Sequence, residues 1–265
     1  MTPRLVATDL DGTLVRSDGT ISDRTRDVIT AVEAHGVPVV FVTGRPLRWA
    51  EEVFDHVGDH GLAVVSNGAL VWDVGADAPR LRREIDPATV RRVCAELREA
   101  VPGSAFAVET LAGIGLEPEF MERHPVPEGA RRAPLAELVD APVLKLLARH
   151  EDLDPQAYWD AAEAAIGADV TITWSSTSTL LEISAYGVTK ATTLAVLAEE
   201  LGVEPEGVLA FGDMPNDLPM LAWAGTAYAM ANAHPSVLAA VDLVAPANDE
   251  DGVAQVLAEV FGLER

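Results

Sequence analysis

The sequence predicts an α/β fold, a Rossmann-like parallel sheet with a smaller α+β unit inserted into it. In the first and last thirds of the chain, short unbroken apolar runs alternate with helical segments, as in parallel sheets covered by helices on both faces. Polar clusters directly follow these runs, and the carboxyl ends of strands form the ligand-binding edge of an open α/β sheet. The middle third lacks this alternation, which indicates a separate unit.

The first third opens with an apolar run, residues 5–8, that ends at Asp9. Ser22 is a suitable N-cap for a helix that Gly36 ends, and Pro46 fits the first turn of a second helix. The expected elements, in chain order, are a strand over 5–8, a helix over 23–35, a strand over 37–42, a helix from Pro46 to about Val57 and a strand over 62–65.

The last third repeats this alternation, so residues 1–80 and 186–265 are expected to form one parallel-sheet unit. Its expected elements, in chain order, are a helix over 189–201, a strand over 207–211, a short helix over 216–222, strands over 226–230 and 243–245, and a closing helix over 250–261.

The middle of the chain, residues 81–185, is predicted to be an inserted α+β unit. Asp86-Pro87 and Asp154-Pro155 each pair an N-cap with proline at the first helical position, which predicts helices to about residues 100 and 167. Extended segments are expected over 69–74, 81–85, 105–109, 143–147, 170–174 and 179–183.

Composition limits the binding partners and the cellular compartment that the sequence predicts. The 265 residues are 49% hydrophobic, which suffices for a buried core, and carry a net charge of −23 from 42 acids and 19 bases. Such a field repels nucleic acid and anionic membrane surfaces, so neither is predicted as a partner. Cys94 is the only cysteine, and the sequence shows no signal peptide and no apolar run near the about 20 residues that span a bilayer. These features predict a cytoplasmic protein, and no pattern indicates an oligomeric state.

The first chemical cluster is Asp9-Leu10-Asp11-Gly12-Thr13, directly after a strand. Alternate residues share a face, so Asp9 and Asp11 can project toward one ligand. Two close carboxylates are costly without a cation between them, and all-oxygen ligands suit Mg²⁺. The pair therefore predicts a magnesium site, and the alternative is an ordinary Asp-Gly turn.

Two further positions favour an anion. Thr43 and Gly44 follow the second strand, where a hydroxyl and a backbone N–H that open a helix suit a phosphate; the alternative is an ordinary strand-to-helix turn. Lys190 begins a late helix, and only Lys145 and Lys190 are lysines among the 19 basic residues. A compact ammonium suits phosphate as a point charge, and the alternative is a solvated surface lysine.

The fourth cluster, Gly212-Asp213 followed by Asn216-Asp217, also comes after a strand. Asp213 and Asp217 are candidates to hold a cation, and the alternative is a capped loop and helix. In order, the four clusters resemble the four motifs of the haloacid dehalogenase (HAD) superfamily. Asn67-Gly68-Ala69 and the large insertion are similar to its Cof-type subgroup, subfamily IIB. The resemblance implies a HAD-like catalytic core, residues 1–80 and 186–265, and a cap domain, residues 81–185.

The resemblance also implies a role for each matched residue. Asp9 would attack phosphorus and form an aspartyl-phosphate, and Asp11 would act as general acid and then as general base. The other implied roles are phosphate binding by Thr43, Gly44, Lys190 and Asn216, and Mg²⁺ binding by Asp9, the Asp11 backbone carbonyl, Asp213 and Asp217.

The cap is expected to close over the site and supply specificity contacts. Arg45, Asn67 and Lys145 are candidate substrate contacts. For Lys145 the alternative is an exposed sheet face, and Glu182, on another expected strand, is assigned to the surface.

The predicted function is that of a Mg²⁺-dependent phosphatase acting on small phosphorylated metabolites, such as sugar phosphates or phosphorylated cofactors. A phosphomutase of the same fold would return the phosphoryl group to a second hydroxyl. A phosphoacceptor signalling module would keep a long-lived phospho-Asp9, but Asp11 and the large cap argue against it. A non-catalytic binding protein would keep only the scaffold.

Overall fold

The computed structural model describes residues 2–54, 61–173 and 179–263, and the chain divides into two compact units. The parent unit comprises Met1–Leu81 and Thr189–Arg265, and the inserted unit comprises Arg82–Val188. The predicted insertion, residues 81–185, starts one residue earlier and ends three residues earlier than the inserted unit. Among the described residues, no helix combines the length and apolarity needed to cross a membrane.

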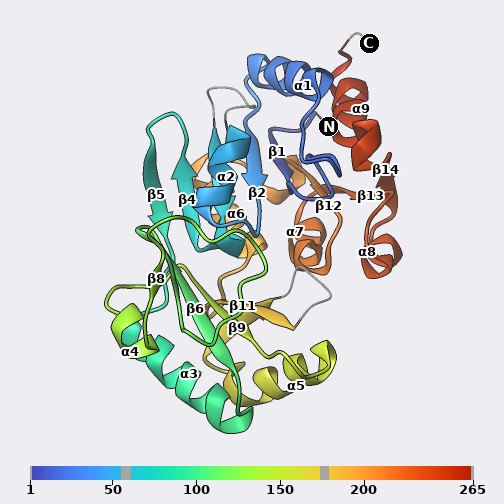
Figure 1. The fold of residues 1–265 in the computed structure, drawn as a ribbon. Helices are drawn as coiled ribbons and strands as arrows, with labels where there is room; N and C mark the ends of the chain where they lie inside the picture. Colours follow the sequence, from blue (N-terminus) through green and yellow to red (C-terminus); the bar gives the residue numbers. More distant parts are fainter. Residues whose placement is uncertain (1, 55–60, 174–178, 264–265) are drawn as a thin grey trace. The chain divides into compact units, whose positions relative to one another are not determined.

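The described strands of the parent unit form one sheet in the order β14-β13-β12-β1-β2-β3-β4-β5 (Figure 1). Neighbours from β14 to β3 are parallel, and β4 joins β3 antiparallel. The central strands are buried along their whole length, as expected where helices cover both faces. The strands are β1 Leu5–Thr8, β2 Val39–Val42, β3 Leu62–Val65, β4 Leu70–Asp73, β5 Ala78–Arg82, β12 Val208–Gly212, β13 Thr226–Met230 and β14 Leu243–Ala245.

Helices alternate with these strands along the chain. Ser22 caps α1 by accepting from the Thr25 N–H, and Thr189 forms a capping box with Thr192 at the start of α6. The predicted end of α2 near Val57 lies outside the described residues. The helices are α1 Asp23–Ala34, α2 Leu47–Phe54, α6 Lys190–Glu200, α7 Leu218–Trp223, α8 Pro235–Ala240 and α9 Gly252–Phe261, with single-turn 3₁₀ segments at Ser66–Gly68, Pro205–Gly207, Pro215–Asp217 and Asn248–Glu250.

β1 lies where the strand order reverses. The chain passes from β1 through α1 to β2 on one side, whereas β12, reached much later, pairs with the other side of β1. In an open α/β sheet this reversal leaves a crevice outside the carboxyl ends of the strands. The residues that follow β1, β2 and β12 therefore share one edge of the sheet.

The inserted unit has its own sheet, and its described strands follow the order β10-β11-β9-β6-β7-β8. All neighbours are antiparallel except β7 and β8. α3 and α5 bury one face in a core that includes Cys94, Phe106, Leu146 and Tyr158. The elements are α3 Pro87–Ala100, β6 Ala105–Thr110, β7 Gly113–Leu116, β8 Arg131–Arg132, α4 Leu135–Leu138, β9 Lys145–Arg149, α5 Pro155–Ile166, β10 Val170–Thr173 and β11 Leu180–Ala185.

Several local predictions were wrong. The strand expected over 81–85 is β5, three residues earlier, and the strand expected over 143–147 begins at Lys145. The reason is that Ile85 and Val143 pair with each other in an isolated bridge instead of extending a ladder. Four short elements were not predicted, because they are too short or too rich in glycine to give a periodic signal: β7, β8, α4 and α8. The predicted end of β10 at Trp174 lies outside the described residues.

Candidate active site

Asp9 follows β1 directly and is buried, with its carboxylate paired to Lys190. The Lys190 Nζ donates to Oδ1 of Asp9 over 2.6 Å and to Oδ1 of Asp217 over 2.7 Å. Lys190 is the first residue of α6, where the helix dipole disfavours a cation. The two carboxylates therefore compensate the ammonium for both its burial and its position.

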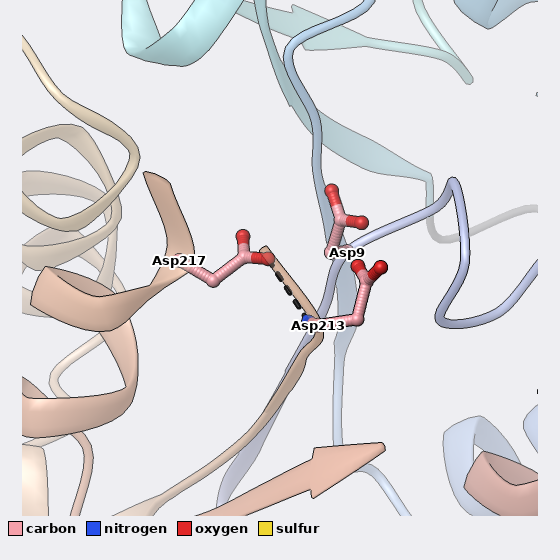
Figure 2. Close-up of side chains that lie close together, drawn as sticks. All are labelled: Asp9, Asp213 and Asp217. Carbon is pink, nitrogen blue, oxygen red and sulfur yellow. Dashed lines mark hydrogen bonds between the residues drawn. The ribbon is translucent and has the colours of Figure 1, made fainter. Parts of the chain in front are cut away.

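Asp213 and Asp217 come from the segment that follows β12. Oδ2 of Asp217 accepts from the backbone N–H of Asp213 over 3.1 Å (Figure 2). The same oxygen accepts from the backbone N–H of Met214 over 3.0 Å, and the two bonds fix this carboxylate. Asp9, Asp213 and Asp217 each offer one carboxylate oxygen within 4.8 Å of the others. Three carboxylates so close together have the donor chemistry of a divalent-cation site.

The pKa shifts in this group show that its carboxylates lack sufficient positive charge. Burial raises the pKa of Asp9 well above its ordinary value, Lys190 opposes the rise, and Asp217 and Asp213 add to it. Burial and then Asp217 raise the pKa of Asp213 to about 6. Burial lowers the pKa of Lys190, but Asp217 and Asp9 outweigh it and raise this pKa above its ordinary value. One ammonium for three carboxylates leaves excess negative charge that a divalent cation would neutralise.

The donor set fits such a cation. Both oxygens of Asp217 accept hydrogen bonds, from Lys190 and from backbone N–H groups, so the orientation of this carboxylate is fixed. Asp213 is oriented by Thr13, whose hydroxyl donates to its Oδ1 over 3.0 Å. Gly12 has a φ of +75°, and a Cβ there would lie 2.3 Å from Oδ2 of Asp213, so only glycine allows the two loops to approach this closely.

Thr43, Gly44, Asn67 and Asn216 converge beside the ends of β2, β3 and β12. The buried Thr43 accepts at Oγ1 from the Arg45 N–H over 3.0 Å, and its carbonyl accepts from the Asn67 N–H over 3.1 Å. A Cβ on Gly44 would lie 3.0 Å from Oδ1 of Asn67, and Nδ2 of Asn216 donates to the same oxygen over 3.4 Å. Oδ1 of Asn216 is buried and has no hydrogen-bond partner in the described part of the chain.

The turn after β3 has a backbone that the sequence did not predict. Ser66, Asn67 and Gly68 all have positive φ, at 52°, 56° and 102°. The hydroxyl of Thr193 in α6 donates to the Gly68 carbonyl over 2.7 Å, which ties this turn to the helix that begins with Lys190. Consecutive residues in this region of φ are costly and cluster at functional sites. The Ser-Asn-Gly run was the available signal, because Asn and Gly tolerate positive φ best.

Asp11 lies apart from the three buried carboxylates. Its side chain is 60% exposed and forms a bidentate ion pair with Arg45, with Nε donating to Oδ2 over 2.8 Å and the second contact at 2.5 Å. Arg45, predicted as a substrate contact, is therefore paired with the predicted general acid.

Lys145 lies in β9 of the inserted unit, where it is 3% exposed and donates to Oε1 of Glu182 over 2.5 Å. Glu109 of β6 lies opposite Lys145 in the sheet register. The alternative of an exposed sheet face for Lys145 and the surface assignment of Glu182 are therefore wrong. The reason is that each charge has an opposite partner on a neighbouring strand, which allows both to be buried.

Comparison with known proteins agrees with this geometry. The family model of haloacid dehalogenase-like hydrolases matches residues 6–257. The chain belongs to this family. The predicted superfamily, its Cof-type branch and the α/β fold are thereby confirmed. The matched residues span nearly the whole length of this HAD-like hydrolase and include parts of both units.

Several relatives of this HAD-like hydrolase are phosphatases. The 5-amino-6-(5-phospho-D-ribitylamino)uracil phosphatase YcsE of Bacillus subtilis is 30% identical over 96% of this chain and 94% of its own length. A phosphoglycolate phosphatase of Methanopyrus kandleri is 26% identical, with 97% of each chain covered. The crystal structure of a haloacid dehalogenase-like hydrolase from Bacteroides thetaiotaomicron matches with a TM-score of 0.79 and 25% identity, covering 98% of this chain and 100% of that one. The prediction of a phosphatase-type hydrolase is confirmed by these relatives.

Proposed function

We propose that this HAD-like hydrolase is a Mg²⁺-dependent phosphatase that releases phosphate from small phosphorylated metabolites through an aspartyl-phosphate on Asp9. The observation that supports the proposal is the buried group of Asp9, Lys190, Asp213 and Asp217 at the edge where β1 and β12 end. Phosphoryl transfer depends mostly on positioning and charge stabilisation. This group supplies a fixed nucleophile, an ammonium and carboxylates for a metal.

In the first step, a carboxylate oxygen of Asp9 bonds to phosphorus as the bond from phosphorus to the leaving alcohol breaks. Asp11 donates a proton to the departing oxygen. Lys190 holds Oδ1 of Asp9 in place and offsets the negative charge of the phosphoryl group.

In the second step, Asp11 is a carboxylate and accepts a proton from water. The water oxygen bonds to phosphorus, the bond to Asp9 breaks, and inorganic phosphate leaves. Asp9 is restored as a carboxylate and Asp11 as an acid, so the cycle balances in atoms and protons.

Other polar groups are assigned to the phosphate and the metal. The Thr43 hydroxyl, the Gly44 N–H and the Asn216 side chain bind phosphoryl oxygens. Bound Mg²⁺ would add positive charge against those oxygens, with Asp9, the Asp11 backbone carbonyl and Asp213 as ligands and Asp217 orienting them. Its oxygen-only donor set is what Mg²⁺ prefers.

The inserted unit is assigned the role of a cap that selects the leaving group, and the protein is expected in the cytoplasm. Arg45, Asn67 and Lys145 are the proposed substrate contacts. Arg45 is placed beside the leaving group because its guanidinium already holds Asp11. The named relatives act on a phosphorylated ribityl compound and on phosphoglycolate, so sugar phosphates, phosphorylated cofactor precursors and small phosphorylated acids are the substrate classes to test.

The test is a phosphate-release screen over these classes, with Mg²⁺ or with EDTA, on the wild type and Asp9→Asn. Asp27→Asn is the matched control, because it removes an exposed carboxylate from α1. We expect Mg²⁺-dependent release that falls by about 10³-fold or more in Asp9→Asn and is unchanged in the control. Release that survives Asp9→Asn overturns the proposal. Conversion of a hexose phosphate to its isomer without phosphate release would replace it with a phosphomutase.

A further inference from the structure

Two asparagines near the C-terminus hold the loop that carries Asp11. Nδ2 of Asn232, in the turn after β13, donates to the Gly12 carbonyl over 2.7 Å. Nδ2 of Asn248, after β14, donates to the Val15 carbonyl over 2.9 Å. The backbone N–H of Asn248 also donates to Oδ1 of Asn232 over 3.0 Å, so the two side chains form one connected pair.

A second set of contacts joins the continuation of the same loop to the start of α9. Arg16 forms a bidentate ion pair with Asp251, with Nε donating to Oδ1 over 3.0 Å and Nη2 donating to Oδ2 over 2.8 Å. The N–H and hydroxyl of Ser17 each donate to Asp249 over 2.8 Å. Residues 12–17 are therefore tied to residues 232–251, which lie more than 200 positions later in the chain.

The contact of Asn232 is the one nearest to the chemistry. Gly12 directly follows Asp11 in the chain, and its carbonyl is the group that Asn232 contacts. Gly12 has the left-handed φ that turns the chain away from the strand. The Asp11 side chain is 60% exposed, so packing does little to fix it. Beside the ion pair with Arg45, the place of this side chain is set by its backbone, which the hydrogen bonds to residues 12–15 hold.

We infer that Asn232 and Asn248 are positioning residues for Asp11, acting through the Gly12 and Val15 carbonyls. The inference rests on the proposed function, in which Asp11 protonates the leaving group. Asn232 itself is exposed and contributes little to a core. Its loss should therefore misplace the acid without unfolding the parent unit.

The experiment compares kcat/KM for a hexose 6-phosphate, whose alcohol needs protonation, with that for p-nitrophenyl phosphate, whose leaving group departs without it. The kcat/KM value reports steps up to departure of the leaving group, so it isolates the acid role of Asp11 from its later base role. The variants are Asn232→Ala, which removes the donor, and Asn232→Asp, which keeps the shape and the acceptor for Asn248. Asn232→Gln retains both functions, and Ser17→Ala is the control within the same set of contacts.

Loss of one hydrogen bond that positions the acid should lower kcat/KM for the hexose phosphate about tenfold in Asn232→Ala and Asn232→Asp. The value for p-nitrophenyl phosphate should change by less than about twofold. Asn232→Gln should recover part of the loss, and Ser17→Ala should match the wild type. Thermal unfolding, measured in parallel, should move little in every variant.

Equal losses on both substrates, or a fall in activity that follows the melting temperature, would mean that the contact only stabilises the fold and would overturn the inference. So would wild-type values for Asn232→Ala and Asn232→Asp while Asp11→Asn loses the hexose phosphate activity. A wild type that releases phosphate from none of the substrate classes screened above would instead remove the proposed function, and the inference with it.

Discussion

The two lysines of the protein, one in each unit, can be compared directly. Lys190 of the parent unit donates to Asp9 and Asp217, and Lys145 of the inserted unit donates to Glu182. Both side chains are buried, at 2% and 3% exposure. Burial and ion pairing are thus common to both, and neither property alone marks a reaction site.

The surroundings of the two ammonium groups differ. Lys145 lies on β9, between the neighbouring strands β11 and β6 that carry Glu182 and Glu109. Lys190 begins a helix, where its charge is disfavoured, and its partners belong to a group that has one carboxylate more, Asp213. An arrangement that is electrostatically costly in two ways, and that lies at the carboxyl edge of the sheet, indicates function more strongly than burial and ion pairing within a sheet do.

The largest expected effect is that of Lys190→Met. Phosphate release should fall by about 10³-fold or more, because the variant removes the charge against the phosphoryl group and the donor that fixes Asp9. Lys190→Arg should recover stability but little of the rate, since a planar guanidinium cannot replace a compact ammonium between two carboxylates. Kinetic assays beside Lys145→Met check this. Equal losses in the two Met variants would break the comparison between the lysines.

An intermediate effect is expected from the pH dependence of Asp213. Its pKa is about 6 in the folded protein and 3.8 ordinarily, so its contribution to stability is complete below pH 3.8 and is lost as pH rises through 6. In EDTA, the free energy of unfolding of the wild type should therefore fall by about 2 kcal/mol more between pH 4 and 7 than that of Asp213→Asn does. Metal binding needs the carboxylate, so stabilisation by Mg²⁺ should grow over the same interval.

Urea unfolding of the wild type and Asp213→Asn at pH 4.5, 6 and 7.5, with EDTA or Mg²⁺, measures both quantities. Parallel pH profiles for the two proteins in EDTA would show that Asp213 is not the group that titrates. Stabilisation by Mg²⁺ that persists in Asp213→Asn would remove Asp213 from the metal site.

The comparison also shows what sequence can and cannot predict. Strand ends and motif spacing were enough to place Asp9, Lys190 and Asp213 at one edge, because parallel strands bring their carboxyl ends together. They could not reveal that Asp11 pairs with Arg45, since a side-chain contact between residues 34 positions apart leaves no periodic pattern. The same signals missed Asn232, which lies 220 residues from the carbonyl that it contacts and outside the four motifs.

Lys145 is a second residue whose partner could not be predicted from the sequence. Apolar neighbours in sequence predicted a strand, but its pairing with Glu182 depends on the order of β6, β9 and β11. Strand order in a mixed or antiparallel sheet is not encoded in the local pattern of either strand. The sequence therefore predicted the parallel unit better than the inserted one.

The smallest expected effect on activity is that of Lys145→Met, which should raise KM by less than about tenfold because it removes at most one substrate contact. Its main effect should be on the inserted unit, where Glu182 loses its ammonium at a cost of about 3 kcal/mol. Cys94 reports this unit alone, because it is the only cysteine, and burial raises its pKa above the ordinary value and makes it unreactive.

Thiol labelling of Cys94 should be about 100-fold faster in Lys145→Met than in the wild type, since each 1.4 kcal/mol changes the opening equilibrium tenfold. Lys145→Met combined with Glu182→Leu should reverse most of that change, because an apolar pair replaces an unpaired buried charge. Lys190→Met should leave the labelling rate unchanged. If Lys190→Met accelerated labelling as much as Lys145→Met does, the two units would open together, and the two lysines could not be assigned to separate structural and catalytic tasks.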